Sequence, residues 1–272
     1  MSGTVLGARL RAVGARDLVA DSDANLWGLW RHMGQRAPRG SVEEDADVLA
    51  VATGCQVATF NPVFVRQVRP DVDAEALVRK AIDREVPVVV TANPSIEGID
   101  RLLRAARRTG LVDGRPLPGM ALPLDGTVTD RAPATPETLR IVPVGDDRGW
   151  RQYFDVLCRA FDVPFEVIEP IAVPAIFDDE RMTALLGCIG GEPVASSLGF
   201  VERGVVGVYN VGTLAPHRGK GIGAAMTRAA VAWGKARGAE SAVLQASEMG
   251  RRVYERMGFA EVVPYVQLVS PH

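Results

Sequence analysis

The amino-acid sequence predicts an α/β fold in which a mixed, α+β type of sheet is built twice along one chain. Short apolar runs of strand length alternate with amphipathic segments of helix length. The order of elements in the first half (two or three strands, helix, strand, helix ending in glycine, strand) returns in the second half. Between the halves, Asp125–Glu137 contains a glycine, two prolines and several threonines, which is typical of a linker. We therefore expect two domains, residues 1–130 and 131–272.

Local signals predict each element of the first half. Asp21-Ser-Asp-Ala offers N-cap chemistry for a helix that carries Leu26, Trp30 and Met33 on one apolar face. Pro62 interrupts an apolar run and indicates a bulge or an edge position there. The further elements expected are strands at Val48–Thr53, Val57–Val68, Val88–Thr91 and Met120–Leu124, and helices at Ala74–Glu85 and Ser95–Arg108.

The second half repeats this order. Three prolines within Val163–Phe177 predict a loop or a broken helix. The expected strands are Leu139–Pro143, Thr183–Ile189, Val194–Val201, Val205–Leu214, 241–246 and Val262–Val269, and the expected helices are Trp150–Phe161, 221–237 and 248–257.

Composition narrows the class of protein. The net charge of −2 provides no basic field for nucleic acid or a membrane surface. The three cysteines are scattered without disulfide or metal-ligand spacing, and the three histidines are dispersed, so we expect no metal and a reducing, cytoplasmic setting. No apolar run approaches the ~20 residues of a membrane span, and Met1–Arg11 lacks the apolar core of a signal peptide.

A glycine-rich, basic turn, Arg218-Gly-Lys-Gly-Ile-Gly223, joins the strand Val205–Leu214 to the following helix. Its glycines allow positive φ angles and close approach of a ligand to the backbone. The helix N-terminus adds about half a positive charge, and Arg218 and Lys220 add two more. The turn is therefore predicted to bind an anion, most simply a phosphate.

A dinucleotide is one phosphate ligand that fits such a turn, and a ligand with more phosphate charge is another. Gly219-x-Gly221-x-x-Ala224, with Glu240 downstream, also matches a dinucleotide fingerprint. Only about two strands can follow it, too few for a doubly wound sheet. Two cations inside the loop favour a ligand with more phosphate charge.

The flanking sequence resembles the GNAT family of N-acetyltransferases from about Leu139 to Ser270. Arg218-x-x-Gly221-x-Gly223 matches that family's acyl-CoA loop. The other matching stretches are the central strand Gly207–Leu214, the next strand Ala242–Ser247, and the ending Ser247-x-x-Gly250-x-x-x-Tyr254-Glu-Arg-Met-Gly-Phe259. The sequence departs from the family pattern at Ala215, where a proline is usual, and at Ser247, where an asparagine is frequent.

The resemblance implies an acetyl-CoA-dependent N-acetyltransferase that acts on a primary amine of a small molecule or peptide. Tyr254 would be the general acid that protonates the leaving thiolate. The residues implied to hold acyl-CoA are Val211, Gly212, Thr213, Arg218, Gly219, Lys220, Gly221, Ile222, Gly223 and Ser247. We expect no nucleic-acid or membrane partner, and the last strand could pair within the monomer or across a homodimer.

The general base stays open, because the sequence favours none of the five candidates Glu166, Glu169, Glu202, Tyr209 and Asn210. Two other functions also stay open. One is a non-catalytic acyl-CoA-binding sensor that keeps the loop without turnover. The other is a nicotinamide dinucleotide binder.

The first half resembles a degenerate unit of the same family, as in tandem GNAT proteins. Arg69-Pro-Asp-Val-Asp-Ala-Glu75 stands where the second half has its glycine turn, and its acids would repel a phosphate. Ala106 stands where the second half has Tyr254. An unrelated α/β cap is the alternative.

Overall fold

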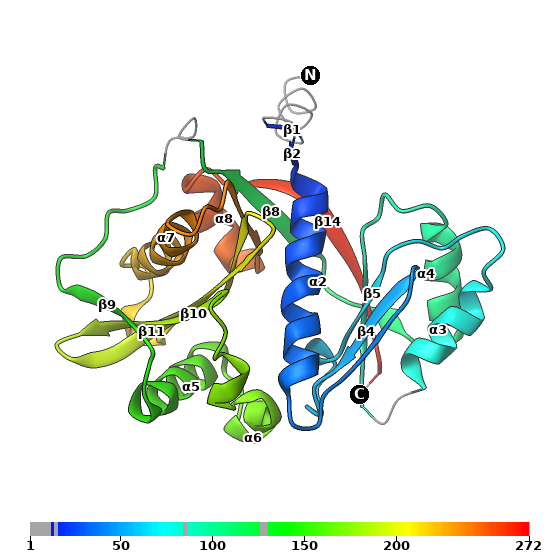
Figure 1. Ribbon diagram of the computed structural model, residues 1–272, viewed down its shortest axis with the longest axis horizontal. Coiled ribbons are helices and arrows are strands. Elements are labelled where there is room, and N and C mark those ends of the chain that lie inside the picture. The colour runs from blue at the N-terminus through cyan, green and yellow to red at the C-terminus, as the bar shows by residue number, and fades with distance from the viewer. Residues whose placement is uncertain (1–11, 14–15, 84–85, 126–129, 272) are drawn as a thin grey trace. The chain divides into compact units, whose positions relative to one another are not determined.

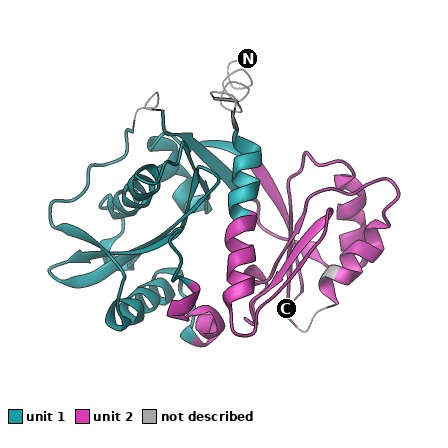
Figure 2. Cartoon of the chain, viewed as in Figure 1, with its two compact units in different colours: residues 1–26, 118–165, 177–262 teal, residues 27–117, 166–176, 263–272 magenta. Residues whose placement is uncertain are grey.

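The computed structural model describes residues 12–13, 16–83, 86–125 and 130–271 of the chain. These residues form two compact units that are assembled from interleaved segments (Figure 2). Unit 1 contains the chain up to Leu26, Pro118–Phe165 and Phe177–Val262. Unit 2 contains Trp27–Leu117, Glu166–Ile176 and the chain from Val263 onward.

The predicted mixed α/β architecture is confirmed. The sheet of unit 1 has the order β9-β10-β11-β12-β13-β8 and is antiparallel except between β12 and β13. Its strands are β8 (Leu117–Pro123), β9 (Leu139–Pro143), β10 (Met182–Ile189), β11 (Glu192–Glu202), β12 (Val205–Thr213) and β13 (Ser241–Gln245). Its helices are α5 (Asp147–Phe161), α7 (Ile222–Lys235), α8 (Glu248–Arg256) and the start of α2 (Leu18–Arg36), preceded by the short pair β1 (Ala12–Val13) and β2 (Arg16–Asp17).

Helices α7 and α5 cover opposite faces of the unit 1 sheet (Figure 1). On one face, Met226 and Ala230 of α7 pack in a buried cluster with Val206 and Val208 of β12. On the other, a Cβ placed on Gly212 would lie 2.8 Å from Cβ of Ala160 in α5. Strand β12 is therefore buried between two helices, as its nearly continuous apolar sequence requires.

Unit 2 has a sheet of order β3-β4-β5-β6-β14, with β7 also paired to β14. Its strands are β3 (Ser41–Glu44), β4 (Val48–Ala52), β5 (Pro62–Val65), β6 (Val89–Ala92), β7 (Val112–Asp113) and most of β14 (Ala260–Val269). Helices α3 (Ala74–Ile82) and α4 (Ile99–Arg108) pack on it through Val78, Leu102 and Ala106. The predicted broken segment Val163–Phe177 is confirmed, because it holds the short helix α6 (Phe165–Ile168) and two 3₁₀ turns.

The two units exchange their final strands. Strand β8 ends the first half of the sequence but pairs with β13, whereas β14 ends the second half and pairs with β6. Each compact unit thus contains residues from both sides of the predicted boundary near residue 130. The predicted domains 1–130 and 131–272 describe the repeated halves of the sequence and stay a prediction.

Three local expectations are corrected. Helix α2 begins at Leu18, because the carboxylate of Asp17 accepts hydrogen bonds from the N–H groups of Val19 and Ala20. Strand β3 was not expected, since its sequence is mostly polar and exposed. Pro62 is the first residue of an internal strand, where a missing N–H is tolerated, so it marks neither a bulge nor an edge.

Candidate functional site

The central strand β12 is bent by a bulge. Between the pairs Ser196–Gly212 and Leu198–Tyr209, two residues of β12 stand opposite one residue of β11. Asn210, in the bulge, has a φ angle of 53°, and its carbonyl accepts a hydrogen bond from the Ser196 hydroxyl at 3.0 Å. Such a bulge turns the strand away from its neighbour and exposes backbone groups.

Strands β12 and β13 diverge beyond this bend. Their parallel pairing covers only Val205–Gly207 opposite Ser241–Val243. Farther along, β13 pairs only with β8 and β12 only with β11, among the residues that the structure describes. The divergence leaves a wedge between two parallel strands. Val211, Gly212 and Thr213 lie on the β12 side of this wedge. Their role in holding an extended ligand arm, which the family resemblance implies, stays a prediction.

The glycine-rich turn leads from β12 into α7. Gly219 and Gly221 have φ angles of 75° and 79°, a conformation that favours glycine. The first helical hydrogen bond of α7 runs from the Ala225 N–H to the Gly221 carbonyl. The N–H groups of residues 219–224 therefore find no acceptor within the described parts of the chain, and they stand at a helix N-terminus. This group of donors fits the phosphates of a coenzyme A moiety.

Two cations of the turn are folded back onto the protein backbone. Arg218 donates from Nε to the Thr213 carbonyl at 3.0 Å and from Nη2 to the Ala160 carbonyl at 2.8 Å. Lys220 donates from Nζ to the Pro216 carbonyl at 3.1 Å. Arg218 thus ties the turn to the end of α5 as well as supplying charge, a role that the sequence did not reveal.

The turn lies directly beside the bulged strand. A Cβ on Gly223 would lie 3.9 Å from Oγ1 of Thr213 and 4.0 Å from Cγ1 of Val211. The structure therefore brings together the wedge residues and the phosphate-loop residues that the sequence predicts. The unpaired N–H groups of the loop therefore lie next to the edge of β12 that faces the wedge.

Tyr254 of α8 reaches toward the start of α7. Burial raises the pKa of Tyr254 to about 12, and a hydrogen bond with the Thr227 side chain opposes part of this rise. Thr227 is fully buried and donates to the Gly223 carbonyl at 2.9 Å, which links Tyr254 to the glycine loop. The phenol is consequently protonated across the physiological pH range and can only donate its proton there.

Ser247 stands at the other end of α8. Its hydroxyl accepts the Gly250 N–H at 3.1 Å and so caps the helix. A role for the exposed Ser247 in binding acyl-CoA stays a prediction.

The linker also contributes to the loop. Arg228 of α7 binds the Asp130 carboxylate at 2.6 Å and the carbonyls of Ala132 and Pro133 at 3.1 and 2.8 Å. The Arg228 hydrogen bond lowers the pKa of Asp130. A Cβ on Gly221 would meet Cβ of Pro133 at 3.0 Å, so this part of the linker forms one wall of the glycine turn.

The candidate bases have defined surroundings. The Tyr209 hydroxyl donates to Oδ1 of Asn25 at 2.7 Å, and burial raises the pKa of Tyr209 far above its usual range. The phenol therefore stays protonated near neutral pH and cannot take a proton from an amine. Glu202 lies 3.8 Å from the Arg181 guanidinium. Glu166 and Glu169 are exposed in the segment that belongs to unit 2.

Asn210 is the remaining candidate. It is exposed, and its amide donates to the Tyr153 hydroxyl at 3.3 Å. An amide is not basic near neutral pH, so Asn210 can position an amine but cannot take its proton.

Three polar residues near the wedge escaped the sequence analysis. Asn25 is fully buried and donates to the carbonyls of Phe200 and Val205, which fixes α2 to β11 and β12. His217 Nδ1 and Gln245 Nε2 are buried without a hydrogen-bond partner among the described residues. The only sequence signal for Gln245 is a polar residue at the end of an apolar strand.

Unit 2 has no equivalent of this site within its described residues. Its parallel pair β5–β6 stays paired from Pro62–Val89 to Val65–Ala92, so the strands form no wedge. At the N-terminus of α3, the Asp73 carboxylate accepts from two helix N–H groups and occupies the position that an anion would take.

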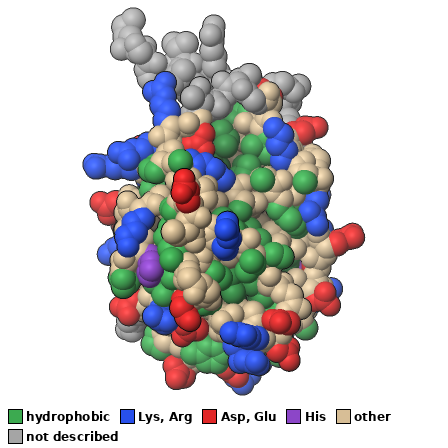
Figure 3. All heavy atoms as spheres, turned by 90° about the vertical axis from the view of Figure 1, so that its left-hand side faces the viewer, with side chains coloured by type: hydrophobic (Ala, Val, Ile, Leu, Met, Phe, Trp, Pro, Cys, Tyr) green, Lys and Arg blue, Asp and Glu red, His purple; other side chains and the backbone are tan. Residues whose placement is uncertain are grey.

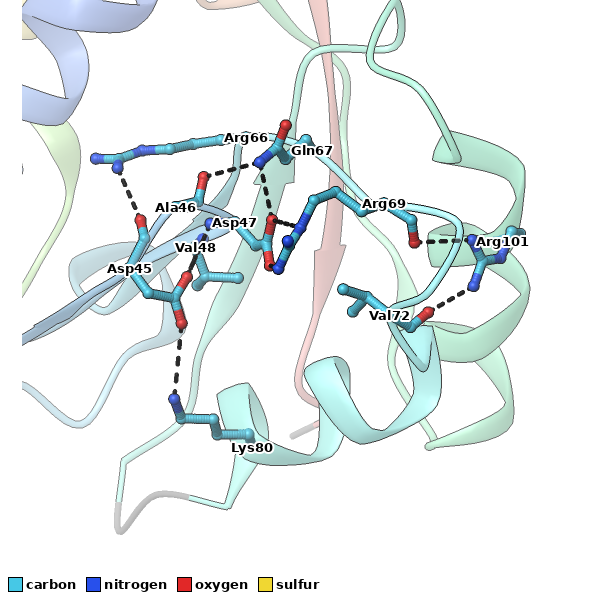
Figure 4. A network of polar contacts seen from close by, with 10 residues as sticks. All are labelled: Asp45, Ala46, Asp47, Val48, Arg66, Gln67, Arg69, Val72, Lys80 and Arg101. Carbon is cyan, nitrogen blue, oxygen red and sulfur yellow. Dashed lines mark hydrogen bonds and ion pairs between the residues drawn. The ribbon is translucent and has the colours of Figure 1, made fainter.

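The loop that precedes α3 is held by internal contacts (Figure 4). Arg69 forms a two-pronged bond with Asp47, and its bond lowers the pKa of that carboxyl. Arg101 donates to the carbonyls of Arg69 and Val72. An external phosphate would have to displace these bonds.

Among the described residues, no cluster of three or more His, Cys, Asp or Glu could hold a metal ion, and none of their helices is both long and apolar enough to span a bilayer. On the face of unit 1 drawn in Figure 3, basic side chains are interspersed with acidic and hydrophobic ones.

Comparison with known proteins finds a family model that matches part of the chain and several similar structures. Residues 150–259 match the model of the acetyltransferase (GNAT) family. No curated protein sequence matches the chain. Among solved structures, a GCN5-related N-acetyltransferase from Kribbella flavida is similar at 22% identity, covering 92% of this chain and 94% of that one with a TM-score of 0.66.

Two further structures are similar over most of the chain. A GCN5-related N-acetyltransferase from Sphaerobacter thermophilus shares 21% identity, covering 84% and 81% of the two chains with a TM-score of 0.59. A tandem GNAT protein from the clavulanic acid biosynthesis pathway shares 13% identity, covering 92% and 95% with a TM-score of 0.57. Residues 150–259 therefore match the GNAT acetyltransferase family model, and the fold over most of the chain is similar to that of GNAT proteins, a tandem one among them.

Proposed function

We propose that this protein is an N-acetyltransferase that moves an acetyl group from acetyl-CoA to a primary amine of a small molecule or peptide. The family and the fold support acyltransferase activity. The observation that carries the finer proposal is that the unpaired N–H groups of residues 219–224 lie beside Val211 and Thr213, where β12 has separated from β13.

Each predicted binding residue except Ser247 has a part in this proposal. The N–H groups of Gly219–Gly223 hold the pyrophosphate at the start of α7. Arg218 keeps the loop in place through its bonds to Thr213 and Ala160, and Lys220 adds positive charge. The backbone of Val211–Thr213 holds the pantetheine arm in the manner of a missing strand.

The chemistry is a direct acyl transfer. The amine nitrogen forms a bond to the thioester carbon, the carbon–sulfur bond breaks, and the sulfur takes the phenolic proton of Tyr254. The nitrogen of the adduct carries two protons, of which one stays in the amide product and the other leaves to solvent through water, because none of the five candidate bases is favoured by its surroundings. A proton from solvent then restores the Tyr254 phenol. Backbone N–H groups at the bulge stabilise the carbonyl oxygen as it gains charge.

The first test is calorimetric titration with acetyl-CoA, using the wild type, Lys220→Met and the control Lys235→Met. Lys235 is the last residue of α7, at the opposite end of that helix from the loop that contains Lys220. We expect micromolar binding that is weakened in Lys220→Met and unchanged in Lys235→Met. The absence of binding by the wild type would exclude this function.

Turnover separates the enzyme from an acyl-CoA-binding sensor. Release of free CoA thiol is followed with a panel of primary amines. An enzyme releases CoA faster with at least one amine than without any. A sensor binds acetyl-CoA but shows no amine-dependent release.

A further inference from the structure

Gln245 is the last residue of β13, at the point where this strand has separated from β12. Its Nε2 atom is buried and has no hydrogen-bond partner in the described parts of the chain. A buried donor without an acceptor is unfavourable, so a ligand atom or an ordered water usually supplies the acceptor that the protein lacks.

Strand alternation places the Gln245 side chain. Ala242 and Leu244 belong to the buried cluster under α7, so Ser241 and Gln245 point to the opposite face. The Ser241 hydroxyl confirms this direction, because it donates to Asp21 of α2 at 3.0 Å. Gln245 therefore lies on the face of the wedge that is opposite the α7 helix.

The register places Gln245 across the wedge from Tyr209. The last parallel pair is Gly207–Val243, and both Tyr209 and Gln245 lie two residues beyond it. Tyr209 itself is occupied, because its hydroxyl donates to Asn25, and Asn25 donates to two main-chain carbonyls. Of the polar side chains Ser241, Tyr209, Asn25 and Gln245, only the Gln245 amide keeps a donor that no described residue accepts.

We propose that the Gln245 amide donates a hydrogen bond to the thioester carbonyl oxygen of bound acyl-CoA and is a catalytic residue of the acyl transfer. This inference rests on the proposed function. A single neutral N–H suits a carbonyl oxygen rather than a phosphate, for which the loop at the start of α7 provides several N–H groups and positive charge. The oxygen gains negative charge when the amine attacks, and a donor already held in place stabilises that charge.

The test compares Gln245→Met, which keeps the length but loses the donor, with Gln267→Met. Gln267 is a matched control, because it also lies on a strand but its Nε2 donates to the Thr91 hydroxyl at 3.3 Å. Without ligand, we expect the Tm of Gln245→Met to equal or exceed that of the wild type, since an unpaired donor is removed. The Tm of Gln267→Met should fall while its kcat is retained.

With substrate, Gln245→Met should lose about 10²–10³ in kcat, the usual effect of removing one oxyanion donor. The KM for acetyl-CoA should change little. Gln245→Glu should lose at least as much, because a carboxylate offers no N–H and repels the developing charge.

Ligand-induced Tm shifts identify the oxygen involved. Acetyl-CoA should raise the wild-type Tm more than CoA does, and Gln245→Met should abolish that difference. An equal loss of stabilisation by both ligands would overturn the thioester assignment. A fall in the unliganded Tm of Gln245→Met, or retention of kcat in Gln245→Glu, would overturn it as well. If neither ligand shifts the wild-type Tm, the proposed function itself fails.

Discussion

Replacing Tyr254 by Phe tests the proposed acid with one atom removed. Burial raises the pKa of Tyr254 to about 12, whereas an ordinary thiol has a pKa of ~8.5. Proton transfer from this phenol to a solvated thiolate would be uphill by roughly 3.5 pKa units, or about 5 kcal/mol. The transfer is feasible only if the thiolate forms in the same buried surroundings, which would raise the pKa of the thiol too.

We therefore expect Tyr254→Phe to lower kcat by about 10²–10⁴, the range of general acid catalysis, with little change in the KM for acetyl-CoA. Thr227→Val is the control. It removes the hydrogen bond to Tyr254 but leaves the phenol, so its effect on kcat should be smaller. The assay is CoA thiol release with a reactive amine. A kcat for Tyr254→Phe within about threefold of the wild type would show that Tyr254 only packs against α7.

The pH profile checks the same reasoning. An acid with a pKa of about 12 remains protonated throughout the measurable range. The wild-type rate should rise with pH as the amine loses its proton, with no fall caused by Tyr254 below about pH 10. A falling limb below that pH that disappears in Tyr254→Phe would contradict the raised pKa.

Three other predictions concern the loop, the linker and unit 2. Gly221→Ala forces a side chain onto a φ angle of 79° and should destabilise the protein by about 1–2 kcal/mol in urea unfolding and weaken acetyl-CoA binding. Gly190→Ala is its control, because that residue also has positive φ but faces open space; equal loss of binding in both variants would contradict a role for the loop. Arg228→Ala removes the hydrogen bonds that hold residues 130–133 of the linker beside the glycine turn, so it should raise the dissociation rate of acetyl-CoA in stopped-flow measurements. An unchanged rate would show that this part of the linker does not contribute to binding. The Arg31 hydrogen bond lowers the pKa of Glu44 from 4.5 to about 2, so its stabilisation is complete above pH 4.5 and lost as pH falls toward 2. In Glu44→Gln, the unfolding free energy should therefore fall less between pH 4.5 and pH 2 than it does in the wild type. Since the pair is partly exposed, the difference should be below about 3 kcal/mol, measured by urea unfolding across this pH window. An unchanged pH dependence would contradict the assignment.

The sequence revealed the parts of the site that depend on neighbouring residues. The glycines and cations of the turn lie within six positions, so their spacing alone predicts a backbone anion site. The bulge at Asn210 and the wedge were not predictable, because both arise from the register between separate strands. The bond from Arg218 to the Ala160 carbonyl likewise joins residues that the sequence does not connect.

The first half shows a different limit of sequence reasoning. Its acidic loop predicts repulsion of phosphate, whereas the structure shows Asp73 acting as an internal substitute for the anion at the start of α3. The Pro62 expectation failed because Asn61 organises the entry to the strand, accepting from the Thr53 N–H and donating to the Cys55 and Pro87 carbonyls. Such side-chain bonds to distant backbone groups leave no periodic signal.

The exchange of final strands has a consequence for how the protein is made. A ribosome that has completed the first half has produced β6 but not β14, the strand that pairs with its edge. Unit 2 therefore stays unfinished, with an exposed strand edge, until β14 has been synthesised. Pairs as remote as Val89 and Val269 also predict slow, late closure of this sheet. An unpaired edge of this kind favours aggregation of the nascent chain, and removal of β14 would leave unit 2 permanently open at that edge.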